Sequence, residues 1–155
     1  MELSQAVKDV LNNKNRINIL STVNKKGETD LAVFGSAQLT ENDTISFVLK
    51  NTSRSLANIK ETDHASCLIL LPETGGKGLK IKGCRVYLKK QFIERSRNPV
   101  YLVERAEGEE AAAGWEKSFN VDREKKAEER STPDSYLVVF GVVEARPIVD
   151  TGQGI

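Results

Sequence analysis

Short segments in which apolar and polar residues alternate dominate the first 90 residues of this 155-residue chain. A period of two is typical of β-strands, because successive side chains point to opposite faces of a sheet. The pattern predicts strands over 17–23, 30–39, 45–49, 65–71 and 79–88, with a last, almost wholly apolar and therefore central strand over 136–143. The first three are closely spaced, which favours an antiparallel meander.

Helical spacing predicts three further regions. Leu3, Val7 and Leu11 share one face of a short N-terminal helix. Ser53 is suited to cap a short helix after the third strand. A highly charged segment over about 98–130 is predicted to be a helical insert before the last strand. The predicted fold is therefore a single domain over residues 1–155, mainly β with α additions, with six antiparallel strands in a small closed or partly open barrel.

The fifth predicted strand changes its apolar parity. Leu79 and Ile81 occupy odd positions, whereas Val86 and Leu88 occupy even ones. We therefore expect a β-bulge or a sharp bend at Gly83.

Composition excludes several classes of protein. There are 23 basic and 22 acidic residues, so the net charge of +1 provides no general attraction to nucleic acid or an anionic membrane. A single histidine, His64, excludes a metal site built from several histidines. The first residues do not have the pattern of a signal peptide, and Cys67 and Cys84 lie in apolar runs. A cytoplasmic location with buried, reduced thiols is the expectation.

The loop over 50–55 is the strongest local indication of a binding site. It places Lys50 and Arg54 beside several hydroxyl groups, directly before a predicted helix. A helix N-terminus offers free N–H groups and a partial positive charge, so the loop is suited to a phosphate. An ordinary capped helix with solvated charges remains the alternative.

A second basic segment runs from Lys77 to Lys90 and contains no acidic residue. On a small barrel it could contact nucleic acid, but Tyr87 is the only aromatic residue near it, whereas single-strand binders use several stacking aromatics. An exposed strand that its lysines keep soluble is the simpler interpretation.

Several motifs occur in an order known from one family. They are Ile-Leu-Ser-Thr-Val at 19–23 before a Lys-Gly turn, the strand at 31–37, Thr-Ile-Ser-Phe-Val at 44–48, Thr-Ser-Arg-Ser-Leu-Ala-Asn-Ile at 52–59 and Gly-Leu-Lys-Ile-Lys-Gly at 78–83. With the N-terminal helix and the last strand, they resemble the pyridoxamine 5'-phosphate oxidase-like FMN-binding split barrels, and within these the small bacterial FMN-binding proteins. Ser55 stands where the family often has lysine, and an arginine common on the second strand is absent.

The resemblance implies a six-stranded split barrel that binds FMN. The residues it places around the phosphate are Lys50, Thr52, Ser53, Arg54, Ser55 and Asn58. Those it places beside the ring and ribityl chain are Val33, Phe34, Gly35 and Ser36, with Leu49 also lining the site. It further implies a homodimer with the flavin near the subunit interface, and the function of an oxidoreductase or a flavin electron carrier that exchanges electrons with a small-molecule donor or acceptor.

Three other functions remain open. One is a flavin store or sensor without catalysis, another is a nucleic-acid binder that uses residues 77–90, and the third is a haem protein with His64 as the histidine ligand. The sequence names no catalytic residue, since a bound flavin would supply the redox chemistry itself. The role of the helical insert is equally open between covering a neighbouring subunit and packing on its own barrel.

Overall fold

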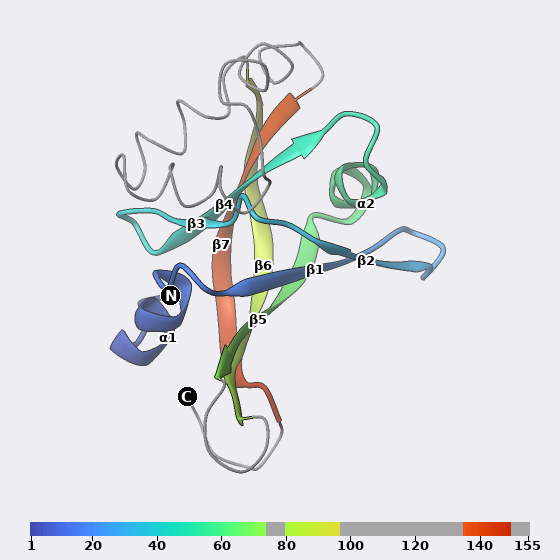
Figure 1. The fold of residues 1–155 in the computed structure, drawn as a ribbon. Coiled ribbons are helices and arrows are strands. Elements are labelled where there is room, and N and C mark those ends of the chain that lie inside the picture. The colour runs from blue at the N-terminus through green and yellow to red at the C-terminus, as the bar shows by residue number, and fades with distance from the viewer. Residues whose placement is uncertain (74–79, 97–134, 150–155) are drawn as a thin grey trace, which may run out of the picture.

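The computed structural model describes residues 1–73, 80–96 and 135–149. They form seven strands and two helices, which in chain order are α1 (Gln5–Leu11), β1 (Ile17–Val23), β2 (Thr29–Val33), β3 (Gln38–Leu39), β4 (Thr44–Lys50), α2 (Arg54–Thr62), β5 (His64–Glu73), β6 (Lys80–Ser96) and β7 (Ser135–Pro147) (Figure 1). All strands belong to one open antiparallel sheet in the order β2-β1-β5-β6-β7-β4-β3. The mainly β prediction is confirmed, and the predicted insert lies outside the described residues.

The prediction of six strands is wrong, because the predicted second strand is two strands at opposite edges of the sheet. β2 pairs with β1, whereas β3 pairs with β4 and β4 continues to β7. The first three predicted strands therefore do not form one meander. Only residues 34–37 separate β2 from β3.

This short connection dictates the shape of the sheet. In a flat sheet the two edge strands would lie six spacings apart, or roughly 29 Å. Five Cα steps, from the end of β2 to the start of β3, span at most about 18 Å. The sheet must therefore curl, so that its two edge strands approach one another.

The core fills the inside of this curled sheet. Phe47 packs edge to face against Phe34 and Phe140, with ring centroids 6.2 and 5.8 Å apart. Strand β7 lies between β6 and β4 and contributes fully buried Val138 and Phe140, as expected of a central strand. On β1 the core side carries Asn18, Leu20 and Thr22, so the more apolar set of this strand faces outward.

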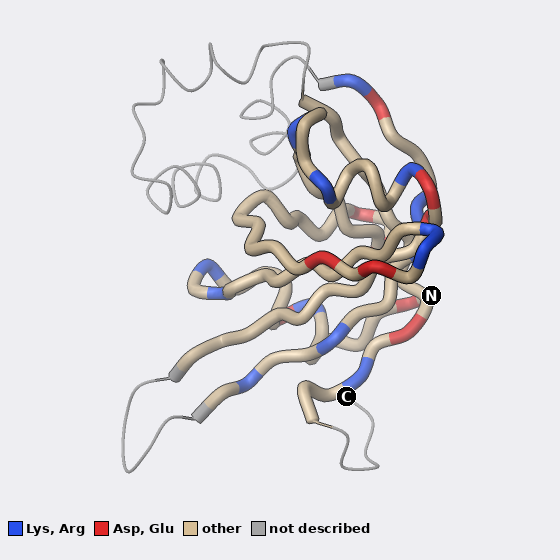
Figure 2. Tube along the Cα trace, turned by 90° about the vertical axis from the view of Figure 1, so that its right-hand side faces the viewer, with Lys and Arg blue, Asp and Glu red and all other residues tan. Residues whose placement is uncertain are grey.

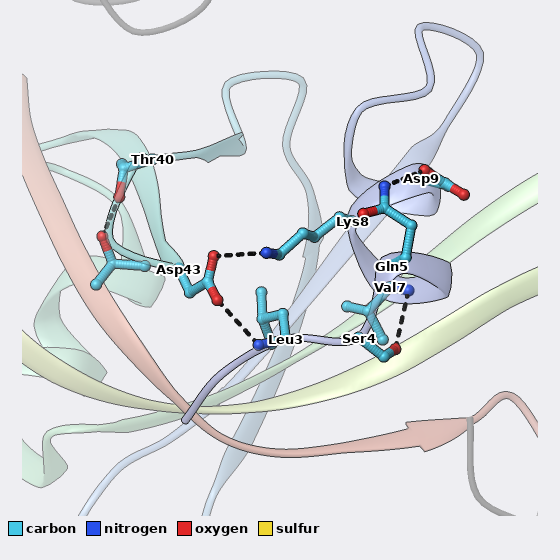
Figure 3. A network of polar contacts seen from close by, with 9 residues as sticks. Leu3, Ser4, Gln5, Val7, Lys8, Asp9, Thr40 and Asp43 are labelled. Carbon is cyan, nitrogen blue, oxygen red and sulfur yellow. Dashed lines mark hydrogen bonds and ion pairs between the residues drawn. The ribbon is translucent and has the colours of Figure 1, made fainter.

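Helix α1 is held to the sheet by Asp43. Ser4 caps the helix by accepting a hydrogen bond from the Val7 N–H (3.4 Å), and the Leu3 N–H donates to Asp43 Oδ2 (2.9 Å). Lys8 Nζ lies 3.5 Å from the other oxygen of the same carboxylate (Figure 3). The hydrogen bond from Leu3, assisted by Lys8, lowers the pKa of Asp43 below its usual value. Among the described helices, none is long and apolar enough to cross a membrane.

Gly83 adopts a conformation that few other residues can adopt, with a φ of 154°. A Cβ atom built there would lie 2.0 Å from the carbonyl oxygen of Ile69 on β5. The predicted bulge is not at this position, because the pairing of β5 with β6 continues through Gly83 without a shift. The register shifts lie between β6 and β7, at Tyr87/Leu88 and Lys90/Phe92. The apolar residues change from odd to even positions because the start of β6 lies outside the core: Ile81 is 42% exposed, whereas Val86 and Leu88 are buried.

Candidate functional site

The loop between β4 and α2 forms a tight, capped entry to the helix. The Ser53 N–H donates to the Lys50 carbonyl (3.0 Å), and the Ser53 hydroxyl accepts from the Leu56 N–H (3.1 Å). The predicted N-cap at Ser53 is thus confirmed. The cap satisfies one amide of the first turn, while the N–H groups of Arg54 and Ser55 have no backbone acceptor among the described residues.

Two cations at this helix end have no acidic partner among the described residues. The side chains of Lys50 and Arg54 are both exposed, and neither forms an ion pair or hydrogen bond with another residue in ranges 1–73, 80–96 and 135–149. Thr52 is exposed between them. Their charges add to the partial positive charge of the helix N-terminus. This end of α2 can therefore hold an anion without first breaking a salt bridge.

Two hydrogen bonds bring the cationic loop beside the segment that connects β2 and β3. The Ser36 hydroxyl donates to the Val48 carbonyl (3.2 Å) and accepts from the Val48 N–H (3.1 Å). At the other end, Ser55 Oγ lies 3.5 Å from Asp30 Oδ2 on β2. The predicted phosphate residues and the predicted ring residues are thus neighbours in the fold.

Several of the predicted site side chains point into the protein. Leu49 and Ser55 are each 1% exposed, and Asn58 donates from Nδ2 to the Thr22 hydroxyl (3.1 Å). Phe34 is packed on Phe47. These residues support the local structure, as Ser36 does through Val48. The predicted side chains that remain open to solvent are those of Val33, Lys50, Thr52 and Arg54.

The sheet face turned away from the core is markedly apolar near this site. Leu31 and Val33 on β2 are each 69% exposed, and Ile17 on β1 is 39% exposed. Val33 and Ile19 are cross-strand partners, as are Leu31 and Ser21, so these side chains share one face. Exposed apolar side chains of this size gathered on one face are typical of a surface that binds a ligand or another protein.

A groove of about 290 Å³ lies on the same face. Its lining includes Ser21 and Ser66, which are cross-strand partners, together with His64, Tyr87 and Val143. His64, the single histidine of the chain, is thus an exposed residue of this groove.

The basic segment on β6 does not present one free cationic surface. Lys90 Nζ lies 2.5 Å from Asp63 Oδ1, and this contact lowers the pKa of Asp63. Arg85 donates from Nε to the Pro147 carbonyl (2.8 Å). Along the described trace, basic and acidic residues are interspersed (Figure 2). Lys77 lies outside the described residues.

Comparison with known proteins identifies the fold. No family profile matches the sequence, and no curated protein matches it. Among solved structures, an FMN-binding protein from Syntrophomonas wolfei subsp. wolfei has a TM-score of 0.58 and 20% identity, covering 92% of this chain and 88% of its own. A Listeria innocua protein provisionally named pyridoxamine 5'-phosphate oxidase has a TM-score of 0.57 and 12% identity, covering 95% and 98%. HutZ, the haem storage protein of Vibrio cholerae, has a TM-score of 0.61 and 14% identity, covering 95% of both chains.

The chain therefore shares its fold with these solved structures. At these identities the likeness establishes the fold alone, since one fold carries many functions.

The prediction from sequence did not include two residues that contact the predicted site, one just before β1 and one on β1. Arg16 and Asn18 both contact the connection between β2 and β3, through Ala37 and Phe34 respectively. One signal in the sequence could have found Asn18, because it is a polar residue on a strand face that also carries Leu20. The alternation alone does not tell which of the two faces is the core.

Proposed function

We propose that this protein binds FMN and acts as an oxidoreductase or flavin electron carrier. The observation that carries the proposal is the pair of cations at the N-terminus of α2, Lys50 and Arg54, which have no ion-pair or hydrogen-bond partner among the described residues. In this proposal Arg54 binds two phosphate oxygens, Lys50 adds a point charge, and the free N–H groups of the first turn donate the remaining hydrogen bonds. The likeness to an FMN-binding protein supports the same ligand.

The neighbouring connection is suited to the rest of the cofactor. Val33 offers an exposed apolar side chain beside Gly35, which has no side chain to obstruct a ring. In this proposal the hydroxyl of Ser36 bonds the Val48 backbone and that of Ser55 bonds the Asp30 carboxylate, so neither needs to contact the ligand. The flavin supplies hydride and electron transfer when it is bound, and the protein supplies binding, orientation and electrostatics.

The apolar outer face supports the proposal of a homodimer. Burying Leu31, Val33 and Ile17 in a monomer would need a cover that the described residues do not provide. A second copy of the chain offers the same apolar surface, and isologous contacts between identical faces are the commonest form of oligomer. In this arrangement the flavin lies close to the interface.

A binding assay with two flavins tests the proposal. We expect the wild-type protein to bind both FMN and riboflavin, and Arg54→Ala to weaken FMN binding about 10- to 100-fold, since hydrogen bonds to charged groups contribute about 1.5–3 kcal/mol each. Riboflavin lacks the phosphate, so its dissociation constant should remain the same. Lys26→Ala is the matched control, because it removes one exposed positive charge from the turn before β2.

Three outcomes would contradict parts of the proposal. A wild-type protein that binds neither flavin would refute it, and a protein purified with a haem spectrum would favour the haem function. Equal losses of FMN and riboflavin in Arg54→Ala would mean that Arg54 supports the fold or the ring. Reduction of the bound flavin by a nicotinamide cofactor separates an enzyme or carrier from a flavin store.

A further inference from the structure

Side chains hold the connection between β2 and β3 in place. The four residues from Phe34 to Ala37 leave β2 at one edge of the sheet and reach β3 at the other. Asn18 contacts Phe34, Arg16 donates from Nη2 to the Ala37 carbonyl, and Ser36 holds both backbone groups of Val48. These contacts tie the connection to β1 on one side and to β4 on the other.

Asn18 holds the start of this connection from two sides. Its backbone carbonyl accepts a hydrogen bond from the Phe34 N–H (3.0 Å), and its side-chain Nδ2 donates to the Phe34 carbonyl (3.0 Å). Both polar groups of the Phe34 backbone are therefore fixed by one residue. The peptide planes on either side of Phe34, which lead to Val33 and Gly35, are fixed with them.

An asparagine at this position is costly to the fold. Asn18 is 3% exposed and lies on the core face of β1, beside Leu20. Its Oδ1 has no hydrogen-bond partner among the described residues. The Asn18 amide therefore has a hydrogen-bond partner for its nitrogen but none among these residues for its oxygen. Buried polar groups without a partner are rare in folded proteins, and those that occur are found mainly at functional sites.

We propose that Asn18 is a positioning residue for the flavin ring. This inference rests on the proposed function, in which Val33 and Gly35 lie beside the ring. Asn18 fixes both backbone groups of Phe34, so the connection between β2 and β3 is already ordered before the ligand binds. Binding then does not have to include the entropic cost of ordering this connection. Arg54 acts on the phosphate, and Asn18 acts on the ring through the backbone.

The role of Asn18 is tested by comparing FMN with riboflavin, which has the same ring but no phosphate. In Asn18→Ala, both FMN and riboflavin should bind about 5- to 10-fold more weakly, since one orienting hydrogen bond to the backbone is lost. The visible circular dichroism of the flavin bound at saturation should also change, because its ring is held less uniformly. Val142→Ala is the control: it removes core volume at a buried position on β7, away from the connection, and should change neither affinity nor spectrum.

A second variant keeps the inference testable if Asn18→Ala does not fold. In Asn18→Asp, a protonated carboxyl can still donate to the Phe34 carbonyl, whereas a carboxylate cannot. Burial raises the pKa of a carboxyl, so riboflavin, which has no phosphate to titrate, should bind this variant more tightly at pH 5 than at pH 8. The wild-type protein and Val142→Ala should show no such change.

The outcomes separate this inference from the proposed function. A wild-type protein that binds no flavin refutes the proposed function, and this inference with it. Wild-type binding together with unchanged riboflavin affinity and spectrum in Asn18→Ala refutes the role of Asn18 alone. A riboflavin affinity of Asn18→Asp that is independent of pH would refute it as well.

Discussion

Replacing Gly83 with alanine should destabilise this fold far more than a typical surface substitution. The new Cβ would lie 2.0 Å from the Ile69 carbonyl oxygen, whereas real Cβ atoms essentially never come within 3.0 Å of another atom. The obstructing atom belongs to the backbone of β5, and Ile69 is fully buried, so β5 and β6 must separate locally. Gly83 also has a φ of 154°, which L-residues rarely adopt.

The expected loss in the free energy of unfolding follows from the backbone strain and from the local separation of β5 and β6. Backbone strain contributes about 1–2 kcal/mol, and two weakened ladder hydrogen bonds contribute about 1 kcal/mol each. The lower entropy of the unfolded chain with alanine returns up to about 1 kcal/mol. The net loss of about 2–4 kcal/mol corresponds to a decrease in Tm of roughly 4–16 °C for a chain of this size.

Gly27→Ala provides the matched control for this experiment. Gly27 also has a positive φ, 82°, but a Cβ atom there would meet nothing within 4 Å. Urea unfolding of both variants therefore separates the cost of the backbone angle from that of the close approach. If Gly83→Ala is no less stable than Gly27→Ala, the close packing of β5 against β6 is not what requires glycine.

Three further predictions concern the N-terminus, the thiols and the outer face. The contact with Leu3 lowers the pKa of Asp43 in the folded state. The Asp43 carboxylate therefore stabilises the fold fully above the usual carboxyl pKa of about 3.9, and this stabilisation is lost as the pH falls below that value. Asp43→Asn should lower the urea midpoint at pH 7 and lower it progressively less in acid, and a difference that stays constant with pH would contradict this. Burial raises the pKa of Cys67 to about 12 and that of Cys84 to about 11, so iodoacetamide at pH 8 should label both thiols only after unfolding, and fast labelling of the folded protein would show that they are accessible. Sedimentation should give a dimer of the 17.2 kDa chain that Leu31→Glu dissociates, whereas a wild-type monomer at micromolar concentration would exclude the shared site.

The sequence determined the parts of this protein that depend on near neighbours along the chain. Alternation indicated most of the strands, and Ser53 indicated the start of α2. The association of Lys50 and Arg54 with a helix N-terminus also needed no tertiary information, because one short loop carries all of it.

The tertiary structure decided everything that depends on which segments meet. Alternation gives two faces for every strand but does not say which is inside, and on β1 the set that includes Asn18 is inside while Ile17 faces outward. The predicted strand over 30–39 is divided because its two halves pair with strands at opposite edges of the sheet. The inward roles of Ser36 and Asn58 depend on partners 12 and 36 residues away, and such contacts exist only once the strands have paired and α2 has packed on the sheet.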